Sequence, residues 1–255
     1  MNQRVAFVTG AGSGLGRAIA LRLSAEGFAV AVTDIDGERG AAVVTEIEGD
    51  GGRAFFLECD VGAVDSVRAA RDDVIESLGG IDCLVNNAGF DTPDFFLQTD
   101  PASWEPLIRV NLIGVLNCIH AMAPIIAERC RDSGYGRIVS IASDAGRVGS
   151  LGEAVYSAAK GGVIAFTKSM ARELARDGVT VNAVCPGPAD TPMTDAIRST
   201  ELGQKMMQRM VGATPLRRLG DPAEVAAAVA YFAGDEARFI TGQALSVSGG
   251  LTMAD

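Results

Sequence analysis

The sequence predicts an α/β fold, in which a doubly wound parallel sheet of about seven strands carries helices on both faces. Short apolar runs alternate with helical segments of roughly ten to fifteen residues, as in strands joined by crossover helices. A length of 255 residues with 48% hydrophobic content is enough for one large core. No linker-like run, repeat or charge block interrupts this pattern, so we expect a single domain over residues 1–255.

The first unit of the chain is a strand, a glycine-rich turn and a helix, in that order. Residues 5–9 are an apolar run, Gly10, Gly14 and Gly16 follow it, and helical periodicity covers residues 15–23. Glycines let the backbone approach phosphate groups, and the free N–H groups at the start of the helix point at them. The strict G-x-G-x-x-G spacing fails in every phase, since the glycines read T-G-x-x-x-G-x-G. The order of elements nevertheless predicts a Rossmann-type dinucleotide site.

The second strand, residues 28–33, ends in Asp34, which lies 20 residues beyond Gly14. An acidic side chain at this place can accept hydrogen bonds from a ribose 2′-hydroxyl and would repel a 2′-phosphate. Asp34 therefore favours NAD over NADP as the cofactor. The alternative is that Asp34 is only a helix N-cap or a turn residue before Asp36 and Gly37.

Helices and strands continue to alternate up to residue 89. We expect helices at 38–47 and 64–78, and strands at 54–59 and 81–85. The carboxyl ends of parallel strands meet at one edge of a sheet, and this edge is where ligands bind. Gly10, Asp34, Asp60 and Asn86 all follow strands directly and should share that edge.

The second half of the chain completes the sheet. We expect helices at 103–126, at 154–176 and at 222–232, and strands at 136–141, 180–185 and 244–248. Asn111 falls inside the first of these helices, where asparagine is unfavourable unless it makes a tertiary hydrogen bond or faces solvent. The fifth strand leads into Ala142-Ser143-Asp144.

Tyr156 and Lys160 stand one helical turn apart on the same face of the predicted helix. A nearby cation stabilises phenolate, so Lys160 should lower the pKa of Tyr156 from about 10 towards neutrality. The pair would then be a general acid and base near physiological pH. The alternative is structural, with a half-buried tyrosine ring and a lysine that extends to solvent.

Composition excludes several classes of function. The N-terminal polar residues lead directly into a short strand, which predicts a cytoplasmic protein without a signal peptide or membrane span. The five cysteines form no C-x-x-C pair and there is a single histidine, His120, so we expect neither a disulfide framework nor a metal site. A formal charge of −10 argues against nucleic acid as a partner.

An ordered set of motifs makes the chain resemble the short-chain dehydrogenase/reductase family over essentially its whole length. The set consists of Thr9-Gly-x-x-x-Gly-x-Gly16, Asn86-Asn-Ala-Gly89, Asn111, Ser143, Tyr156-x-x-x-Lys160 and Pro186-Gly187. The resemblance implies hydride transfer between NAD and a secondary alcohol or ketone, in which Ser143 hydrogen-bonds the substrate oxygen and Tyr156 exchanges a proton with it. Lys160 would bind the nicotinamide ribose and lower the tyrosine pKa. Asn111 would hold a relay water through its backbone.

The resemblance also implies the cofactor contacts. Asp34 would bind the ribose, Asp60 and Val61 the adenine, Asn87 and Gly89 would line the adenosine side, and further contacts would come from Gly10, Ser13, Gly14, Leu15, Gly16, Ile35, Ala88, Tyr156, Lys160, Pro186, Gly187, Ala189 and Thr191. Members of the family that prefer NADP usually carry Arg or Lys at the positions of Ser13 and Ile35. Neither is basic here, which again favours NAD.

More specific strings resemble the 2-hydroxycyclohexanecarboxyl-CoA dehydrogenase group of the family, among them Ile141-Ala-Ser-Asp-Ala-Gly-Arg-Val-Gly149 and Phe239-Ile-Thr-Gly-Gln243. This resemblance implies a cyclic or aryl-substituted β-hydroxyacyl-CoA as the substrate. Residues 191–212 are expected to be a lid over it, with methionines for an apolar acyl group and basic residues for CoA phosphates. Alternatively, these methionines are ordinary packing and the cations a solvated face.

Other functions stay open at this point. One is a dehydrogenase or carbonyl reductase for free secondary alcohols and small ketones, and another is a non-catalytic subunit of a hetero-oligomer. A 3-oxoacyl reductase of fatty-acid synthesis is weaker, because Asp34 argues against the NADPH that such enzymes generally use. Asp91 and Glu153 are expected near the pocket, but their spacing does not identify an acid/base pair. The family resemblance further implies a homotetramer built on the two long helices.

Overall fold

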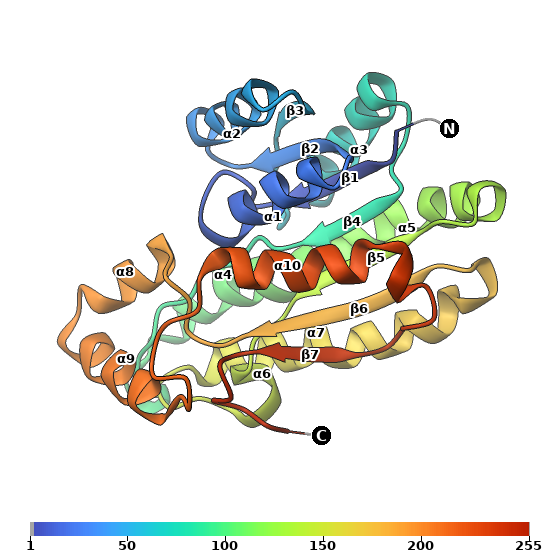
Figure 1. Cartoon of the computed structure of the whole chain (residues 1–255). Coiled ribbons are helices and arrows are strands. Elements are labelled where there is room, and N and C mark those ends of the chain that lie inside the picture. Colours follow the sequence, from blue (N-terminus) through green and yellow to red (C-terminus); the bar gives the residue numbers. More distant parts are fainter. Residues whose placement is uncertain (1–2, 255) are drawn as a thin grey trace.

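A seven-stranded sheet forms the centre of the computed structural model, which describes residues 3–254 (Figure 1). The strand order is β3-β2-β1-β4-β5-β6-β7, and every neighbouring pair is parallel. This confirms the predicted doubly wound sheet, in which the order reverses between β1 and β4. Met1 and Asn2, with which the predicted domain begins, and Asp255, with which it ends, lie outside the described residues.

All seven strands lie where the apolar runs predict them, within two residues at each end. They are β1 Val5–Thr9, β2 Ala29–Asp34, β3 Arg53–Glu58, β4 Cys83–Asn86, β5 Arg137–Ile141, β6 Thr180–Pro186 and β7 Ala244–Val247. Strands β1, β4, β5 and β6 are buried along their whole length, because helices cover both faces of the sheet.

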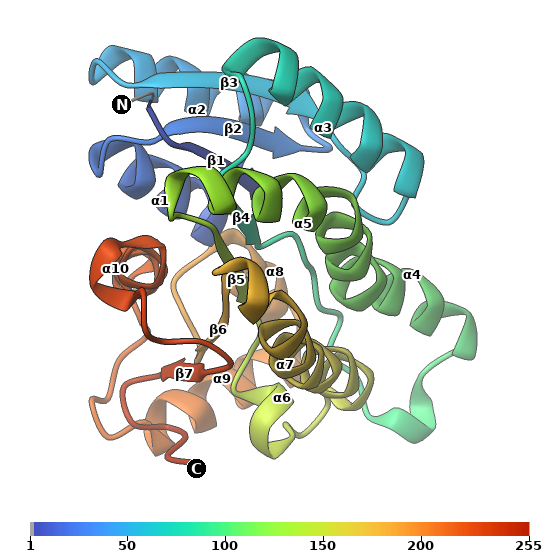
Figure 2. The same ribbon diagram turned by 90° about the vertical axis from the view of Figure 1, so that its right-hand side faces the viewer.

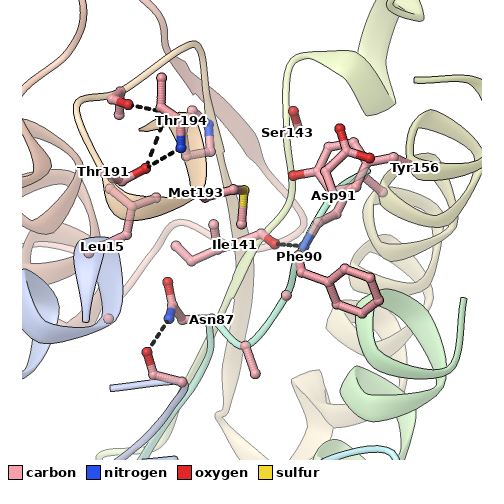
Figure 3. Close-up of a pocket in the computed structure, with 18 of the residues that line it drawn as sticks. Leu15, Asn87, Phe90, Asp91, Ile141, Ser143, Tyr156, Thr191, Met193 and Thr194 are labelled. Atoms are coloured by element: carbon pink, nitrogen blue, oxygen red, sulfur yellow. Dashed lines mark hydrogen bonds between the residues drawn. The ribbon is translucent and has the colours of Figure 1, made fainter. Parts of the chain in front are cut away.

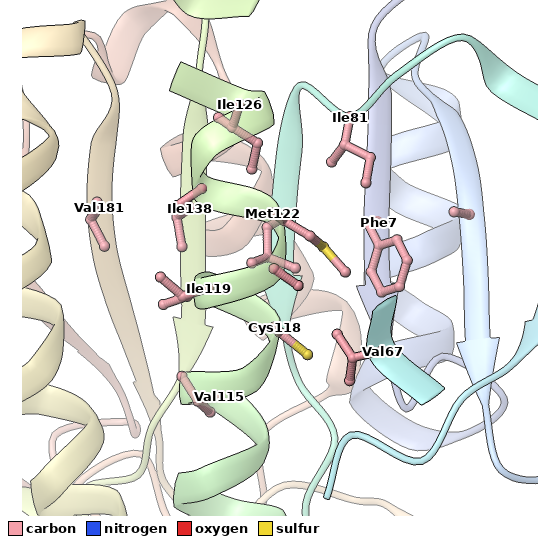
Figure 4. Close-up of a cluster of buried hydrophobic side chains, with 14 of the residues drawn as sticks. Phe7, Val67, Ile81, Val115, Cys118, Ile119, Met122, Ile126, Ile138 and Val181 are labelled. Atoms are coloured by element: carbon pink, nitrogen blue, oxygen red, sulfur yellow. The ribbon is translucent and has the colours of Figure 1, made fainter. Parts of the chain in front are cut away.

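Helices cover both faces of the sheet (Figure 2). One face carries α1 Gly14–Ala25, α2 Gly37–Gly49 and α10 Pro222–Ala233, whose side chains pack in one apolar cluster. The other carries α3 Val64–Leu78, α5 Gly114–Ser133 and α7 Ala154–Leu174, which pack in a second cluster. In Figure 4, Ile119, Met122 and Ile126 of α5 lie against Ile138 of β5 in this second cluster.

Short elements connect these layers. They are η1 Phe96–Gln98, η2 Pro101–Ser103, α4 Trp104–Ile108, η3 Arg109–Ile113, α6 Ala145–Val148, η4 Ala175–Asp177, α8 Pro192–Arg198, α9 Glu201–Ala213 and η5 Asp235–Ala237. Helices α8 and α9 project beyond the sheet at the ends of the strands (Figure 1). They contain the segment that the sequence predicts as a lid.

The predicted helix at 103–126 is wrong in its interior and at its end. A π-helical turn, η3, replaces the α-helix around Asn111. The side chain of Asn111 explains the break, because its Nδ2 donates to the carbonyl oxygens of both Leu107 and Phe90, at 3.0 and 2.8 Å. The helix then continues to Ser133, where Gly134 in the left-handed conformation ends it. Polar residues on its last turns hide this continuation in the sequence.

One helical stretch, Pro101–Ser133, is long and apolar enough to cross a membrane by length and composition, with a mean hydropathy of 1.8. Within the described structure its apolar side chains pack against the sheet, and 56% of the most apolar window is buried. The stretch is therefore a core helix of the fold.

Candidate active site

A cavity of about 490 Å³ opens where the strands end. Its walls come from the residues that follow β1 to β6, from the start of α7 and from α8 and α9. The structure brings every predicted cofactor residue to this wall: Gly10, Ser13, Gly14, Leu15, Gly16, Asp34, Ile35, Asp60, Val61, Asn87, Ala88, Gly89, Tyr156, Lys160, Pro186, Gly187, Ala189 and Thr191. Ser143 also lines the cavity, whereas Asn111 lies behind the wall and is fully buried.

The glycine turn requires its glycines for two reasons. Gly10 and Gly14 have φ values of +61° and +52°, a region that side chains rarely adopt. A Cβ on Gly16 would stand 2.0 Å from the carbonyl oxygen of Gly10, so the start of α1 packs directly on the turn. The backbone of this turn is therefore open to a ligand in the cavity.

Asn87 lines the cavity and also holds the glycine turn in place. Its Nδ2 donates to the carbonyl oxygens of Thr9 and Gly10, at 2.9 and 3.0 Å. The hydroxyl of Thr9 in turn accepts from the backbone N–H groups of Asn87 and Ala88. Asn87 and Thr9 thus join the end of β4 to the glycine turn.

Asp34 stands at the edge of the cavity and is not the helix cap. Asp36 caps α2 by accepting from the N–H of Arg39, so Asp34 is not the N-cap, although its bond to the N–H of Asp36 does make it a turn residue. The Asp34 carboxylate accepts from the backbone N–H groups of Gly12 and Asp36, at 2.8 and 3.1 Å. These bonds fix the carboxylate, and its remaining lone pairs suit the two hydroxyl donors of a ribose.

Arg109 is a cavity residue that the sequence analysis did not single out. It belongs to the π-helical turn, and its Nη1 lies 3.4 Å from Oδ2 of Asp60 and its Nε 3.7 Å from Glu105. Asp60 also accepts from the N–H of Gly62. The Asp60 carboxylate, for which an adenine contact is predicted, is thus held at the cavity wall by Arg109 of the π-helical turn.

The four predicted catalytic residues converge from three elements. Ser143 follows β5 and lines the cavity together with Tyr156 of α7. The Nζ of Lys160 donates to the carbonyl oxygen of Ile141 at 2.9 Å and lies 5.6 Å from the centre of the Tyr156 ring. Figure 3 shows Ser143 and Tyr156 on one side of the cavity, across from Thr191 and Met193. The structural alternative for this lysine is wrong, because its side chain is buried.

Gly89 lies beside both Asn111 and Lys160. A Cβ on Gly89 would stand 2.6 Å from Oδ1 of Asn111 and 3.4 Å from Nζ of Lys160. The Asn111 oxygen is buried and has no hydrogen-bond partner within residues 3–254. The π-helical turn thus directs an unsatisfied acceptor towards the lysine, and such turns are frequent at functional sites.

The expected lowering of the tyrosine pKa is wrong for this structure. Burial raises the pKa of Tyr156, and the negative charges of Asp91 and Glu153 raise it further, while the nearby hydroxyl of Ser143 lowers it. Burial also lowers the pKa of Lys160 to about 8. Removal of water outweighs the attraction between phenolate and ammonium, so the phenol keeps its proton at neutral pH.

Asp91 and Glu153 form a carboxyl pair, although their spacing in the sequence gives no sign of it. Asp91 follows β4 and Glu153 precedes α7, and both line the cavity together with Tyr156. A backbone hydrogen bond of 2.8 Å from Asp94 to Gly152 joins the two segments. Burial and the adjacent Glu153 raise the pKa of Asp91 to about 8.

The predicted lid segment contributes apolar side chains to the cavity. Met193, Ile197, Met207 and Met210 line it, and Met206 is buried beside them. The basic side chains are engaged on the outer surface instead: Arg198 pairs with Asp195, and Lys205 pairs with Glu201. In this conformation the lid offers an apolar wall, while two of its predicted phosphate contacts are already paired.

These residues fit a nicotinamide dinucleotide. The glycine turn presents backbone N–H groups without side chains, Asp34 presents a fixed carboxylate one strand away, and Lys160 lies beside the proton donor. The site therefore has places for a pyrophosphate, a ribose diol and a reacting ring in one cavity.

Fold and site together define an oxidoreductase of the Rossmann class, and the comparisons identify the family. A family model described as Enoyl-(Acyl carrier protein) reductase matches residues 10–252. The chain belongs to the short-chain dehydrogenase/reductase family, as its motifs predict.

Within the family, the chain is similar to enzymes named for acyl thioesters. It is 42% identical over 250 residues to the 3-oxoacyl-[acyl-carrier-protein] reductase FabG of Staphylococcus aureus, covering 97% of this chain and 98% of that protein. It is 39% identical over 247 residues to the acetoacetyl-CoA reductase of Shinella zoogloeoides, with 97% and 98% covered. Among solved structures, it matches a variant of actinorhodin polyketide ketoreductase with NADPH, with a TM-score of 0.91 and 38% identity over 98% of this chain and 99% of that one.

Proposed function

We propose that this protein transfers a hydride between NAD(H) and the β-carbon of an acyl thioester, interconverting a 3-hydroxy and a 3-oxo group. The observation that carries the proposal is the convergence of Ser143, Tyr156 and Lys160 on one cavity whose far wall holds the glycine turn and Asp34. The names of the relatives support the thioester, since one is a reductase of acyl-carrier-protein substrates and another of acetoacetyl-CoA.

NAD(H), when bound, supplies or takes up the hydride. The hydroxyl of Ser143 donates a hydrogen bond to the substrate oxygen and holds it beside the phenol of Tyr156. Tyr156 gives its proton to that oxygen during reduction and takes it back during oxidation. Lys160 is held by the Ile141 carbonyl, from which it reaches the ribose hydroxyls, and Asn111 lies behind it to hold a relay water. The raised pKa of Tyr156 means that the phenol holds a proton to give to the substrate oxygen at neutral pH.

NAD is the proposed cofactor because of Asp34. Its carboxylate is fixed by two backbone donors, and neither Ser13 nor Ile35 beside it is basic. The solved ketoreductase that resembles this chain holds NADPH, so the preference has to be measured. A comparison of kcat/KM with NADH and with NADPH tests it, and a higher value with NADPH would overturn the choice.

The acyl group that we propose is cyclic or aryl-substituted. The strings that resemble 2-hydroxycyclohexanecarboxyl-CoA dehydrogenase support this choice, as does the apolar wall that residues 191–212 provide as a lid. The named relatives favour a second candidate, a linear 3-oxoacyl thioester such as the substrates in their names. We further propose a cytoplasmic homotetramer.

A substrate panel separates these functions. NADH oxidation is followed with a cyclic 3-oxoacyl-CoA, a linear one, the corresponding free acids and simple ketones. We expect the thioesters to react at least ten-fold faster than the acids. Equal rates with simple ketones would favour the free-alcohol dehydrogenase. The absence of turnover with every compound would favour the non-catalytic subunit.

A further inference from the structure

The carboxyl pair of Asp91 and Glu153 stands beside the reacting groups without a role in the hydride transfer described above. Figure 3 shows Asp91 next to the ring of Tyr156, near Ser143. Glu153 is the residue before α7, and its carboxyl makes no cap hydrogen bond to that helix. Both carboxyls thus belong to the end of the cavity where the substrate reacts.

The pair has to hold a proton. Oδ1 of Asp91 accepts from the N–H of Thr92 at 2.9 Å, whereas Oδ2 is shielded from solvent and meets no donor within residues 3–254. The adjacent acidic group is the carboxyl of Glu153, and burial together with its charge raises the pKa of Asp91 to about 8. Two adjacent carboxylates repel each other, so Asp91 and Glu153 together hold one proton and carry a single negative charge near neutral pH.

Within the described chain, the one cation that acts on this charge is Lys160, which lowers the pKa of Asp91 by less than burial and Glu153 raise it. Among the described residues that line the cavity, the basic ones are Lys160 and Arg109. Lys160 donates to the carbonyl oxygen of Ile141, and Arg109 lies at the adenine side with Asp60. The wall opposite the pair is apolar, with Met193 and other residues of the lid segment.

The lid segment also closes over the pair. A Cβ on Gly152, the residue before Glu153, would stand 3.2 Å from Sδ of Met206 in α9. An apolar cover reduces the access of water, and a charge in such a place acts strongly on its neighbours. A ligand group at this point is therefore selected by its charge and its hydrogen-bonding capacity.

We propose that Asp91 and Glu153 form an acidic subsite that selects the substrate: it binds a hydrogen-bond donor, a hydroxyl or an ammonium group, close to the reacting carbon and excludes carboxylates. The inference rests on the proposed oxidoreductase function. It gives a reason for a thioester substrate, because a free 3-oxo acid would place its carboxylate against the pair, whereas the thioester is uncharged there. A donor group on the acyl chain gains a partner that the apolar wall does not offer.

A series of four ketones of nearly equal size tests the subsite. They are 4-aminobutan-2-one, 4-hydroxybutan-2-one, pentan-2-one and acetoacetate, which carry an ammonium, a hydroxyl, a methyl and a carboxylate group at the same distance from the keto carbon. We expect kcat/KM with NADH to fall in that order, with at least a hundred-fold between the first and the last. Thermal-shift titration of the protein with NADH and each ketone gives the order of affinities without turnover.

Two variants show whether the pair causes the order. Asp91→Asn and Glu153→Gln keep the size of the side chain and remove its charge, and each should reduce the ratio between ammonium and carboxylate compounds at least ten-fold. Asp65→Asn on α3, where the side chain is 90% exposed, removes one charge far from the cavity and is the matched control. An order that does not depend on charge, or that is the same in all variants, overturns the subsite.

The two proposals fail in different ways. If 3-oxoacyl-CoA is turned over but kcat/KM is the same for all four ketones, the proposed function stands and the acidic subsite is refuted. If kcat/KM for the ketones depends on charge but no thioester is turned over, the acidic subsite stands and the proposed thioester substrate is refuted.

Discussion

The glycine turn makes a strong prediction at Gly16, where the structure leaves no space for a side chain. In Gly16→Ala, the new Cβ would stand 2.0 Å from the carbonyl oxygen of Gly10 and 2.5 Å from Nδ2 of Asn87. Real Cβ contacts are essentially never below 3.0 Å, so the turn or the helix has to move by about 1 Å. The first of these atoms is backbone and cannot rotate away.

Two effects should follow from this movement. Forcing an extra carbon into a packed site costs about 1–3 kcal/mol of stability. A displacement of about 1 Å in a binding or catalytic geometry costs on the order of a hundred-fold, so the Kd for NADH should rise between ten-fold and a hundred-fold.

Fluorescence titration with NADH measures the loss, and circular dichroism checks that the variant is folded. Gly49→Ala at the end of α2 is the matched control, because a Cβ there meets nothing within 4 Å. If Gly16→Ala binds NADH as tightly as the natural protein, the turn does not hold the dinucleotide and the site has been misassigned.

Two further predictions concern stability and pH. Asp82→Ala should lower the free energy of unfolding by about 3 kcal/mol in urea titrations. The reason is that the buried carboxylate accepts from Nε of Arg129 and from the N–H of Val5, both at 2.8 Å. A loss of unfolding free energy below about 1 kcal/mol would contradict this prediction. The rate of reduction should fall as pH rises through about 8, because the buried Lys160, whose pKa is lowered to about 8, then loses its charge. Asp91 ionises in the same pH range, so the Asp91→Asn variant should show the same fall in rate if the titration of Lys160 causes that fall. A rate of reduction that stays constant up to pH 10 would contradict the role of Lys160.

The strands and most helices could be predicted from the sequence because their signals are local. A run such as residues 180–185 is apolar at every position, which identifies a strand that helices cover on both faces. The π-helical turn could not be predicted in this way. It depends on hydrogen bonds from Asn111 to Phe90, which is 21 residues earlier in the chain, and apolar periodicity contains no trace of that contact.

The candidate site likewise contains some residues that local motifs predict and others that only tertiary packing brings together. Motifs with fixed spacing predict the glycine turn, Ser143, Tyr156 and Lys160 as site residues, and all of them line one cavity. The carboxyl pair is different, because Asp91 and Glu153 meet only through the packing of the segment after β4 against the turn before α7. The direction of the tyrosine pKa depends on the same pair and on burial, and neither can be read from a spacing of four residues.

The exchange of a proton by Tyr156 is the central claim, and Tyr156→Phe tests it most directly. This substitution removes only the hydroxyl that gives the proton and leaves the aromatic ring at the same position of α7. With NADH and a 3-oxoacyl-CoA, the account predicts that kcat falls by at least about a hundred-fold, while the Kd for NADH changes less than three-fold. A kcat equal to that of the natural protein would contradict the account.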